Sequence, residues 1–300
     1  LGAYMSQAVT SNMTVGLGWG KTLTSGVPAI VPRTPDGVRV LSLLGGLTRV
    51  SEVNPSEFAW RVADKLSAEC YMLAAPVYAP DSRTRDALMQ HSGIAEVFAR
   101  ARSLDMAVIS VGDLTPHSVF SEYGLLSREE ISSLVDAGAV GDVLCHFVDA
   151  EGNLVDHPVN NRVLAVNPID LRGTRNIVLA SGGWHKLTVI RAALKLLRPT
   201  VLIVNELVAE RLASDAREIR ARAEARSEAA RATVQLATER IAEEAGATPA
   251  ELLDTLKVDP DRMADAETLD TEVQRLKRQR EALGAVNLRA EEDAKAVDDE

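Results

Sequence analysis

The sequence predicts an α/β fold, with a parallel sheet covered by helices, followed by a long helical C-terminal segment. Short apolar runs bounded by Gly and Pro alternate with amphipathic stretches through the first 205 residues, which is the pattern of alternating strands and helices. All eleven aromatic residues lie between Tyr4 and Trp184. Residues 211–300 contain none, and they carry 15 Lys and Arg against 22 Asp and Glu. A segment of this composition cannot form an ordinary compact core and is typical of a long helix or coiled coil.

Seven apolar runs and five amphipathic stretches make up the first part of the chain. Because the runs have the length of buried strands and alternate with helices, we expect a parallel sheet with helices on its faces. The predicted strands are residues 13–19, 38–46, 70–76, 106–112, 139–148, 176–183 and 200–205. The predicted helices are residues 55–66, 81–90, 93–103, 127–136 and 185–197.

Glycines gather where the predicted strands end, which is where ligands bind in parallel sheets. Glycine lets backbone N–H groups approach an anion, a following helix N-terminus adds partial positive charge, and lysine adds a full charge. Two such loops, each with a lysine, could hold a phosphorylated small molecule. The alternative is that the glycines only permit tight turns. These strand ends are Gly18-Trp19-Gly20-Lys21-Thr22, Gly45-Gly46, Gly112-Asp113, Gly141-Asp142, and Gly182-Gly183 with Lys186.

Two other kinds of site are not expected from the spacing of their residues. Gly20-Lys21-Thr22 ends like a nucleotide-binding P-loop, but the required first glycine is replaced by Val15, so ATP or GTP binding is not predicted. The five histidines lack the spacing of metal ligands, and we expect neither a metal nor another cofactor.

Cysteine usage and hydropathy indicate a cytoplasmic protein. Cys70 and Cys145 both lie in apolar, strand-like surroundings, so we expect two buried, reduced thiols. No run approaches the roughly 18 apolar residues of a membrane-spanning helix. The first ten residues also lack the pattern of a signal peptide.

Six motifs carry a resemblance to a known family. In their order and separations they resemble the effector-binding domain of SorC/DeoR-type bacterial transcriptional regulators, over about residues 1–212. The resemblance implies a Rossmann-like fold shared with ribose-5-phosphate isomerase and glucosamine-6-phosphate deaminase. It also implies a sugar or sugar-phosphate effector that tunes operator affinity, and a homo-oligomer formed through this domain. The motifs are LGWGKTL (17–23), LLGG (43–46), AAPVYAP (74–80), GAVGD (138–142), SGGWHK (181–186) and VLIVNELVAERL (201–212).

The resemblance also implies which residues form the ligand pocket. Asp113 and Asp142 are its candidates for contacts with sugar hydroxyls. Asp113 lies in a Gly-Asp-Leu sequence where Gly-Ile-Gly is common in the family, which adds a side chain and a charge at the pocket mouth. The three predicted walls are Gly18, Gly20, Lys21 and Thr22; Gly45 and Gly46; and Gly182, Gly183 and Lys186.

A sugar-phosphate isomerase of the same fold is the alternative function for this segment. Isomerisation needs a carboxylate base beside the substrate carbon, and similar isomerases present an Asp-Gly-x-Asp-Glu-like cluster. Around Gly141 only Asp142 is found, so we expect no catalytic residue and no enzyme activity. Family members carry a helix-turn-helix before this domain, whereas about ten residues precede the first predicted strand. We therefore expect no direct DNA contact by this chain.

The C-terminal segment shows coiled-coil spacing in two helices. From Leu212, small apolar residues recur at intervals of three and four, until Gly246 and Pro249 end the first helix. A second helix is expected from about Glu267 to Val297. Opposite charges at Glu272 and Arg275, and at Glu292 and Lys295, would support it by about 0.2–0.5 kcal/mol per pair.

This segment carries a second resemblance. ATPAELLDTLKVDP (247–260) and RLKRQREALGAVNLRAEEDAKAV (275–297) are similar to the head-proximal returning arm of SMC chromosome-organising ATPases, over about residues 211–300. The resemblance implies a helix that transmits motion or pairs with a partner helix. The ATPase-head motifs are absent from the sequence, so we expect no ATP hydrolysis. The predicted organisation is a sugar-binding effector domain, 1–212, fused to a helical arm, 213–300; the alternative is a structural arm with a passenger domain.

Overall fold

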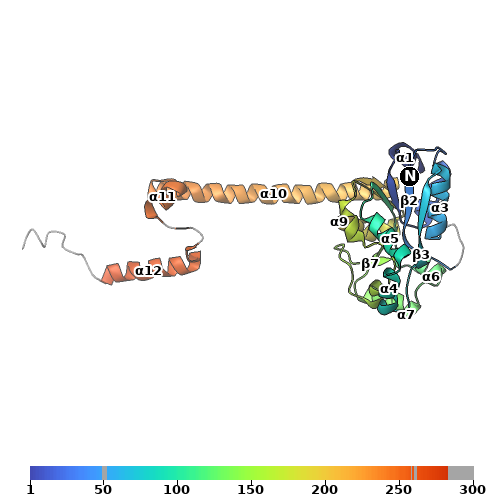
Figure 1. Ribbon diagram of the computed structural model, residues 1–300. Coiled ribbons are helices and arrows are strands. Elements are labelled where there is room, and N and C mark those ends of the chain that lie inside the picture. Colours follow the sequence, from blue (N-terminus) through green and yellow to red (C-terminus); the bar gives the residue numbers. More distant parts are fainter. Residues whose placement is uncertain (49–52, 258, 260–261, 283–300) are drawn as a thin grey trace, which may run out of the picture. The chain divides into compact units, whose positions relative to one another are not determined.

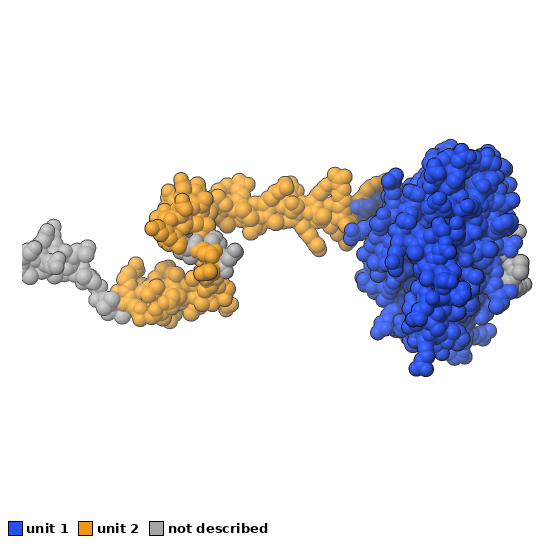
Figure 2. Space-filling model, in the orientation of Figure 1, with its two compact units in different colours: residues 1–216 blue, residues 217–300 orange. Residues whose placement is uncertain are grey.

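The computed structural model describes residues 1–48, 53–257, 259 and 262–282 of the 300-residue chain. Figure 1 shows the arrangement of the elements. The chain divides into two compact units, Leu1–Ala216 and Arg217–Glu300, which Figure 2 colours blue and orange.

The first unit contains a six-stranded sheet in the order β3-β2-β1-β4-β8-β9, and every neighbouring pair is parallel. The predicted α/β fold with a parallel sheet is confirmed. Its strands are β1 (Thr14–Leu17), β2 (Arg39–Gly46), β3 (Glu69–Pro76), β4 (Met106–Ile109), β8 (Asn176–Ala180) and β9 (Val201–Ile203).

Successive side chains of the central strands enter two different apolar layers. Met106 and Val108 pack into the layer that contains Phe58 of α3, whereas Ala107 and Ile109 pack into the layer that contains Ile190 of α9. Because side chains alternate across a strand, both faces of the sheet are buried. The helices of this unit are α1 (Gly2–Ala8), α2 (Lys21–Thr24), α3 (Pro55–Leu66), α4 (Ser82–Met89), α5 (Ser92–Ala101), α6 (Val119–Glu122), α7 (Arg128–Asp136), α8 (Pro158–Asn161) and α9 (Leu187–Leu197), with 3₁₀ turns η1 (Val27–Ala29), η2 (Pro168–Gly173) and η3 (Trp184–Lys186).

Side-chain caps explain where two of the predicted helices begin. The Asn54 side chain accepts a hydrogen bond from Ser56 N, and Pro55 occupies the first turn of α3. Ser127 and Glu130 form a reciprocal capping box at the start of α7. Both arrangements satisfy N–H groups that have no partner within the helix.

The predicted strand 139–148 is wrong as a member of the parallel sheet. It folds into a hairpin of β6 (Gly141–Val143) and β7 (His146–Val148), which joins β5 (Val111–Gly112) in a separate antiparallel sheet. Leu144 and Cys145 have φ of 51° and 62°, so both central residues of the turn are left-handed. Such two-residue turns favour Asn-Gly, and neither residue occurs here to mark the turn in the sequence.

The outer strand β3 is less buried than its sequence predicts. Leu73 is its one buried residue, and Met72 is 45% exposed. The reason is that β3 is an edge strand that pairs with β2 alone. The predicted burial of both cysteines holds for Cys145, whereas Cys70 on β3 is half-buried; both are free thiols.

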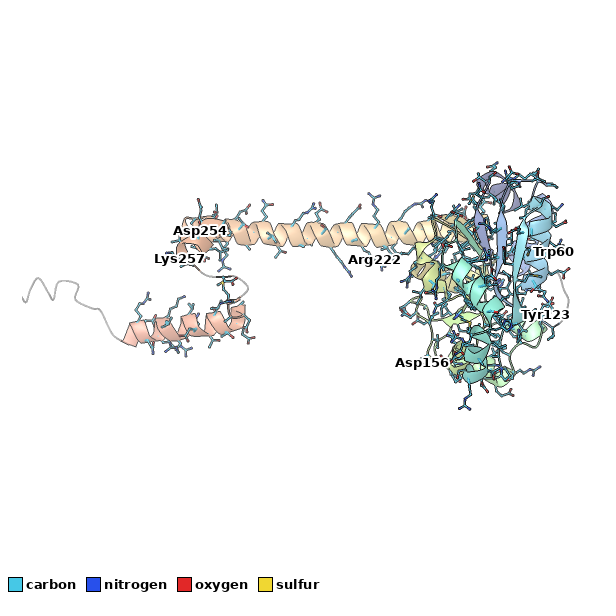
Figure 3. The ribbon with its side chains drawn as sticks, in the orientation of Figure 1. Trp60, Tyr123, Asp156, Arg222, Asp254 and Lys257 are labelled. Atoms are coloured by element: carbon cyan, nitrogen blue, oxygen red, sulfur yellow. The ribbon has the colours of Figure 1, made fainter. Side chains whose placement is uncertain are left out.

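The second unit is helical. α10 (Glu206–Ala245) starts in the first unit and continues into the second, followed by α11 (Pro249–Leu256) and α12 (Ala266–Ala282). Side chains project from α10 around its axis (Figure 3), and Val234 and Leu236 are about two-thirds exposed, at 65% and 67%. α11 was not predicted. Its signal in the sequence is the capping box of Thr248 and Glu251, with Pro249 in the first turn.

α12 agrees with the predicted second helix as far as Ala282. Its predicted continuation to Val297, the Glu292–Lys295 pair and the LGAVNLRAEED sequence lie outside the described residues. The predicted ion pair between Glu272 and Arg275 is present. Within the described ranges, no helix combines the length and the apolar character that crossing a membrane requires.

Candidate functional site

A cavity of about 350 Å³ opens where three neighbouring parallel strands end. Its walls come from the residues that follow β1, β4 and β8, from the loop before α6, and from β6. These three strands are adjacent in the sheet, which explains why loops distant in the sequence meet. The lining residues are Trp19, Gly20, Lys21, Ser110, Val111, Gly112, Asp113, His117, Ser118, Val119, Asp142, Gly182, His185 and Lys186.

One wall follows β1 and carries Lys21. Gly20 has φ of 115°, a backbone conformation that suits glycine, and it starts the short helix α2 at Lys21. Lys21 Nζ donates to Glu122 Oε2 at 2.6 Å. That hydrogen bond is the main cause that raises the pKa of Lys21, so its ammonium group stays charged.

The opposite wall follows β8 and carries Lys186. Gly183, with φ of 98°, starts the 3₁₀ turn η3, which runs directly into α9. Lys186 Nζ donates to the carbonyl oxygen of Val111 at 3.0 Å. An ammonium group has three donors, so two remain for a ligand. The start of the η3–α9 helical run also lies at this wall and favours an anion.

Asp142 is the more deeply buried of the two cavity carboxylates, with 2% of its surface exposed. β6 pairs with β5 so that Asp142 faces Gly112. Its Oδ2 accepts from Cys145 N at 2.7 Å, whereas its buried Oδ1 has no hydrogen-bond partner among the described residues. Burial raises the pKa of Asp142 to about 6, against the hydrogen bond from Cys145, the charge of Lys186 and the nearby backbone N–H of Gly112. A buried acceptor without a partner is suited to a donor from a ligand.

Gly112 is required beside this carboxylate. A Cβ atom at residue 112 would lie 2.2 Å from Asp142 Oδ1 and 3.4 Å from a Phe120 ring carbon. The contact with Phe120 would be an ordinary one, but the Asp142 carboxylate is buried and hydrogen-bonded to Cys145 N, so it cannot move aside at low cost. The close pairing of β5 with β6, which positions Asp142, therefore depends on this glycine.

Asp113 and His185 face each other at the mouth of the cavity. His185 Nε2 lies 3.5 Å from Asp113 Oδ2. Asp113 Oδ1 accepts a hydrogen bond from Thr115 N at 2.9 Å and another from the Thr115 hydroxyl. Because Thr115 occupies Oδ1, the oxygen that faces His185 is Oδ2. The whole Asp113 residue is only 7% exposed.

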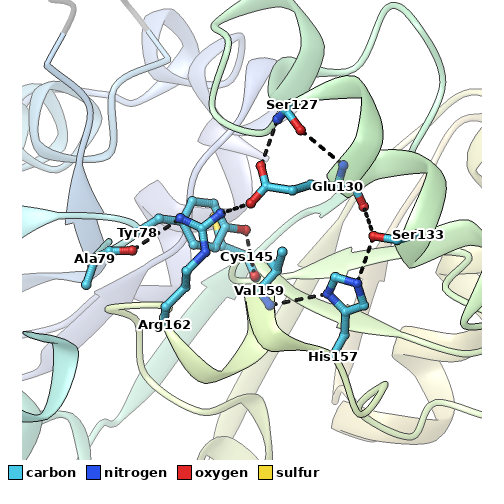
Figure 4. Close-up of polar contacts among 9 residues, drawn as sticks. All are labelled: Tyr78, Ala79, Ser127, Glu130, Ser133, Cys145, His157, Val159 and Arg162. Atoms are coloured by element: carbon cyan, nitrogen blue, oxygen red, sulfur yellow. Dashed lines mark hydrogen bonds and ion pairs between the residues drawn. The ribbon is translucent and has the colours of Figure 1, made fainter. Parts of the chain in front are cut away.

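A polar network holds the β6–β7 hairpin that carries Asp142 (Figure 4). The Tyr78 hydroxyl donates to the carbonyl oxygen of Cys145 at 2.9 Å. The Arg162 guanidinium lies 5.3 Å from the centre of the Tyr78 ring, donates to Ala79 O at 3.2 Å and pairs with Glu130. The network continues through α7 to the start of α8 by bonds among Ser127, Glu130, Ser133, His157 and Val159.

The structure brings together six of the eleven predicted site residues. The cavity is lined by Gly20, Lys21, Asp113, Asp142, Gly182 and Lys186. Gly18, Thr22, Gly45, Gly46 and Gly183 do not line it.

The remaining predicted glycines have roles in the backbone. A Cβ at Gly45 would lie 2.6 Å from the carbonyl oxygens of Ala75 and Pro76, where the pairing of β2 with β3 is irregular. A Cβ at Gly18 would lie 3.3 Å from the carbonyl oxygen of Val108, and Gly183 has φ of 98°, a backbone conformation that suits glycine. The alternative interpretation, that glycine permits tight backbone approach, therefore applies to these positions.

Sequence reasoning missed the wall that precedes α6. His117 and Ser118 line the cavity from a loop without a strand-end glycine, and Val119 lines it from the start of α6. His185 also lines it, although its sequence position next to Lys186 offered a signal. Among the described residues, no group of three or more His, Cys, Asp or Glu side chains is placed to bind a metal ion.

Comparisons with known proteins match the first unit to a family of regulators. The family model described as "Putative sugar-binding domain" matches residues 1–214. The chain is 29% identical over 198 residues to the erythritol catabolism regulatory protein EryD of Brucella abortus, covering 66% of this chain and 62% of that protein. It is 28% identical over 214 residues to the deoxyribonucleoside regulator of Bacillus subtilis, covering 71% and 68%. The chain thus spans about two thirds of the length of these regulators.

Two solved structures share the fold of the first unit. The sugar-binding domain of a transcriptional repressor from Vibrio fischeri aligns with a TM-score of 0.65 and 25% identity, over 72% of this chain and 85% of that one. The sorbitol operon regulator SorC from Klebsiella pneumoniae aligns with a TM-score of 0.65 and 24% identity, over 70% of each chain.

A separate match concerns a shorter segment. Over 67 residues, which are 22% of this chain and 6% of the relative, the chain is 66% identical to the chromosome partition protein Smc of Cereibacter sphaeroides.

The regulators matched by the first unit are not enzymes by name or family. Since the family model covers residues 1–214, the chain belongs to the family of sugar-binding domains of SorC/DeoR-type transcriptional regulators.

Proposed function

We propose that the first unit binds a phosphorylated sugar as an effector and does not turn it over. The observation that carries this proposal is the convergence of Lys21 and Lys186 with Asp113 and Asp142 on one cavity of about 350 Å³. This volume is within the range of small-molecule sites, roughly 300–1,000 Å³. Lysines supply charge for a phosphate, and carboxylates accept hydrogen bonds from hydroxyl groups.

The polar groups of the cavity suggest how such a ligand would be oriented. Lys186 and the start of the η3–α9 run offer positive charge on one wall, and Lys21 offers it on another. Asp142 offers an unpaired buried oxygen between them. We place the phosphate group near the lysines and the sugar hydroxyls near Asp113 and Asp142.

This assignment leads to a role in transcriptional control. The matched relatives are named as regulators of erythritol catabolism and of deoxyribonucleosides. We propose that the unit is the effector-sensing part of such a regulator and that it self-associates. The exposed Trp60 on α3, labelled in Figure 3, and Met72 on β3 are large apolar side chains available for that contact.

Ligand-induced stabilisation tests the binding proposal. A ligand that binds only the folded protein raises the melting temperature when its concentration exceeds the dissociation constant. In a panel of pentose and hexose phosphates, at least one ester should raise the melting temperature, and Lys21→Ala with Lys186→Ala should abolish the shift.

Lys195→Ala is the matched control. Lys195 Nζ also donates to a backbone carbonyl, that of Ala150 at 3.0 Å, but it lies outside the cavity. This variant loses one positive charge and a similar hydrogen bond, as Lys186→Ala does, and should keep the ligand-induced shift. If no ester in the panel moves the melting temperature of the unmodified protein, the proposal is wrong.

The resemblance of residues 211–300 to an SMC arm, together with the 67-residue match to an Smc protein, supports a second candidate function for the helical segment. We propose that it pairs with a partner helix, as a coiled-coil arm. α12 exposes Leu269, Val273 and Leu276 at spacings of four and three, which is a coiled-coil seam. The full chain should gain helical circular dichroism when mixed with a complementary arm peptide, and Val273→Asp should remove the gain.

A further inference from the structure

One of the two cavity lysines already has a negatively charged partner within the protein. Lys21 and Glu122 form an ion pair at 2.6 Å, and their side chains are 60% and 46% exposed. Glu122 ends α6, and the residues just before and at the start of that helix line the cavity. The same loop therefore forms a wall of the site and neutralises a charge within it.

Aromatic packing fixes the backbone next to each member of this ion pair. Phe120, two residues before Glu122, is fully buried. Its ring centre lies 6.0 Å from that of Trp19, two residues before Lys21, in an edge-to-face arrangement. A second contact, of 5.0 Å, joins Phe120 to Phe147. The backbones on either side of the ion pair are thus fixed relative to each other, whereas the two exposed side chains can separate.

Lys186 differs from Lys21 in this respect. Its hydrogen-bond partner is the carbonyl oxygen of Val111, which carries no net charge. An incoming anion can therefore meet Lys186 without displacing a charged group from it. At Lys21, the same anion must replace the Glu122 carboxylate.

We propose that Glu122 is a resident counter-ion of the cavity, which an anionic group of the ligand must displace from Lys21. This inference rests on the proposed binding of a phosphorylated sugar. A phosphate monoester carries about 1.5 to 2 negative charges at neutral pH, more than the carboxylate that it replaces. Glu122 therefore lowers the affinity of the cavity for every anion, and it favours ligands that carry more charge than one carboxylate.

Removing the charge of Glu122 tests the inference. Glu122→Gln should lower the dissociation constant of ribose 5-phosphate and glucose 6-phosphate by about threefold, the size of an exposed ion pair. The affinity for ribose and glucose, which have no anionic group, should not change. Isothermal titration calorimetry at fixed ionic strength measures both.

Two further variants isolate the contact with Lys21. Glu96→Gln removes the same charge from another exposed ion pair, with Arg100 on α5 at 2.8 Å, and should leave the affinities unchanged. In a Lys21→Met background, Glu122→Gln should give no gain, because the charge that Glu122 neutralises is gone. A gain that persists there, or equals that of Glu96→Gln, would overturn the inference.

A measurement without any ligand tests the same assignment. The reactivity of Lys21 toward acetic anhydride, followed by mass spectrometry, should rise in Glu122→Gln because the carboxylate that stabilises the protonated, unreactive amine is gone. If the unmodified protein binds the esters but Glu122→Gln neither tightens binding nor exposes Lys21, this inference fails and the proposed function stands. If neither protein binds any ester, the proposed function fails, and this inference with it.

Discussion

At the scale of single residues, the cavity is defined by how its charged groups are partnered. Lys21 has Glu122, Lys186 has the carbonyl of Val111, and Asp142 has one oxygen bonded to Cys145 N and one without a partner. Each partnership follows from the backbone path around the strand ends. The residue types were visible in the sequence, but their partners were not, because Glu122 is 101 residues from Lys21.

The raised pKa of Asp142 predicts a specific dependence of stability on pH. The folded protein holds the Asp142 proton up to about pH 6, whereas an unfolded aspartate releases it near pH 3.8. The protonated Asp142 side chain therefore stabilises the folded protein fully below pH 3.8, and this stabilisation is lost as the pH rises through 6. Asp142→Asn does not titrate, so its free energy of unfolding should increase relative to the unmodified protein by up to about 3 kcal/mol between pH 4 and 7.

Urea unfolding of both proteins at several pH values in this interval measures the difference. His146, whose burial lowers its pKa to about 4, is present in both proteins and cancels in the comparison. Parallel stability profiles from pH 4 to 7 would contradict the assigned protonation of Asp142.

At the scale of elements, the β6–β7 hairpin determines the site, although the sequence predicted it least well. The run 139–148 has the length and apolar character of a buried strand, and periodicity cannot distinguish one long strand from two short ones joined by a tight turn. The turn has no Gly or Asn, and the left-handed conformations of Leu144 and Cys145 are sustained by the contacts around them.

The polar network behind the hairpin predicts a stability effect. Arg162 is 18% exposed, pairs with Glu130 and donates to Ala79 O. Arg162→Ala should lower the free energy of unfolding by about 2 kcal/mol, since it leaves a partly buried carboxylate and a carbonyl without their donor.

Chemical denaturation measures this loss, and Glu96→Gln is the control. The exposed pair of Glu96 with Arg100 should cost at most about 0.5 kcal/mol. A loss at Arg162 no larger than that of the control would show that the network does not hold the hairpin.

At the scale of the whole molecule, the chain joins two units of different composition. Within the described part of the chain, the buried apolar residues end at Val208, and the apolar residues named on α10 beyond that point are mostly exposed. The contrast follows from composition, because the second unit has no aromatic side chains and a dense set of charges. The family model also ends at residue 214, next to the boundary between the units.

A truncated chain that ends at Ala216 should therefore keep the stability of the first unit. It retains every buried core residue named above and the ion pairs of Asp215 with Arg191 and Arg211. We expect its melting temperature to match that of the full chain within about 2 °C, with the same ligand-induced shift. Differential scanning fluorimetry measures both, and a decrease of more than about 5 °C would contradict the independence of the first unit.

Residue patterns alone were enough to predict the α/β class, six strands of the parallel sheet, the change at the C-terminal segment, and the family of the first unit. These properties depend on periodicity, composition and motifs in order, which are local or additive along the chain. It also identified Gly20, Lys21, Asp113, Asp142, Gly182 and Lys186 as candidates that the structure brings to one cavity.

Which glycines face that cavity and which permit close backbone packing depends on how the strands and loops pack together in three dimensions. Gly45 lies against β3, and Gly18 lies against β4, because of strand order and register rather than residue type. The loop from Asp113 to Glu122 enters the site because Phe120 packs between Trp19 and Phe147. Such contacts join residues about 27 to 100 positions apart, and no local pattern specifies them.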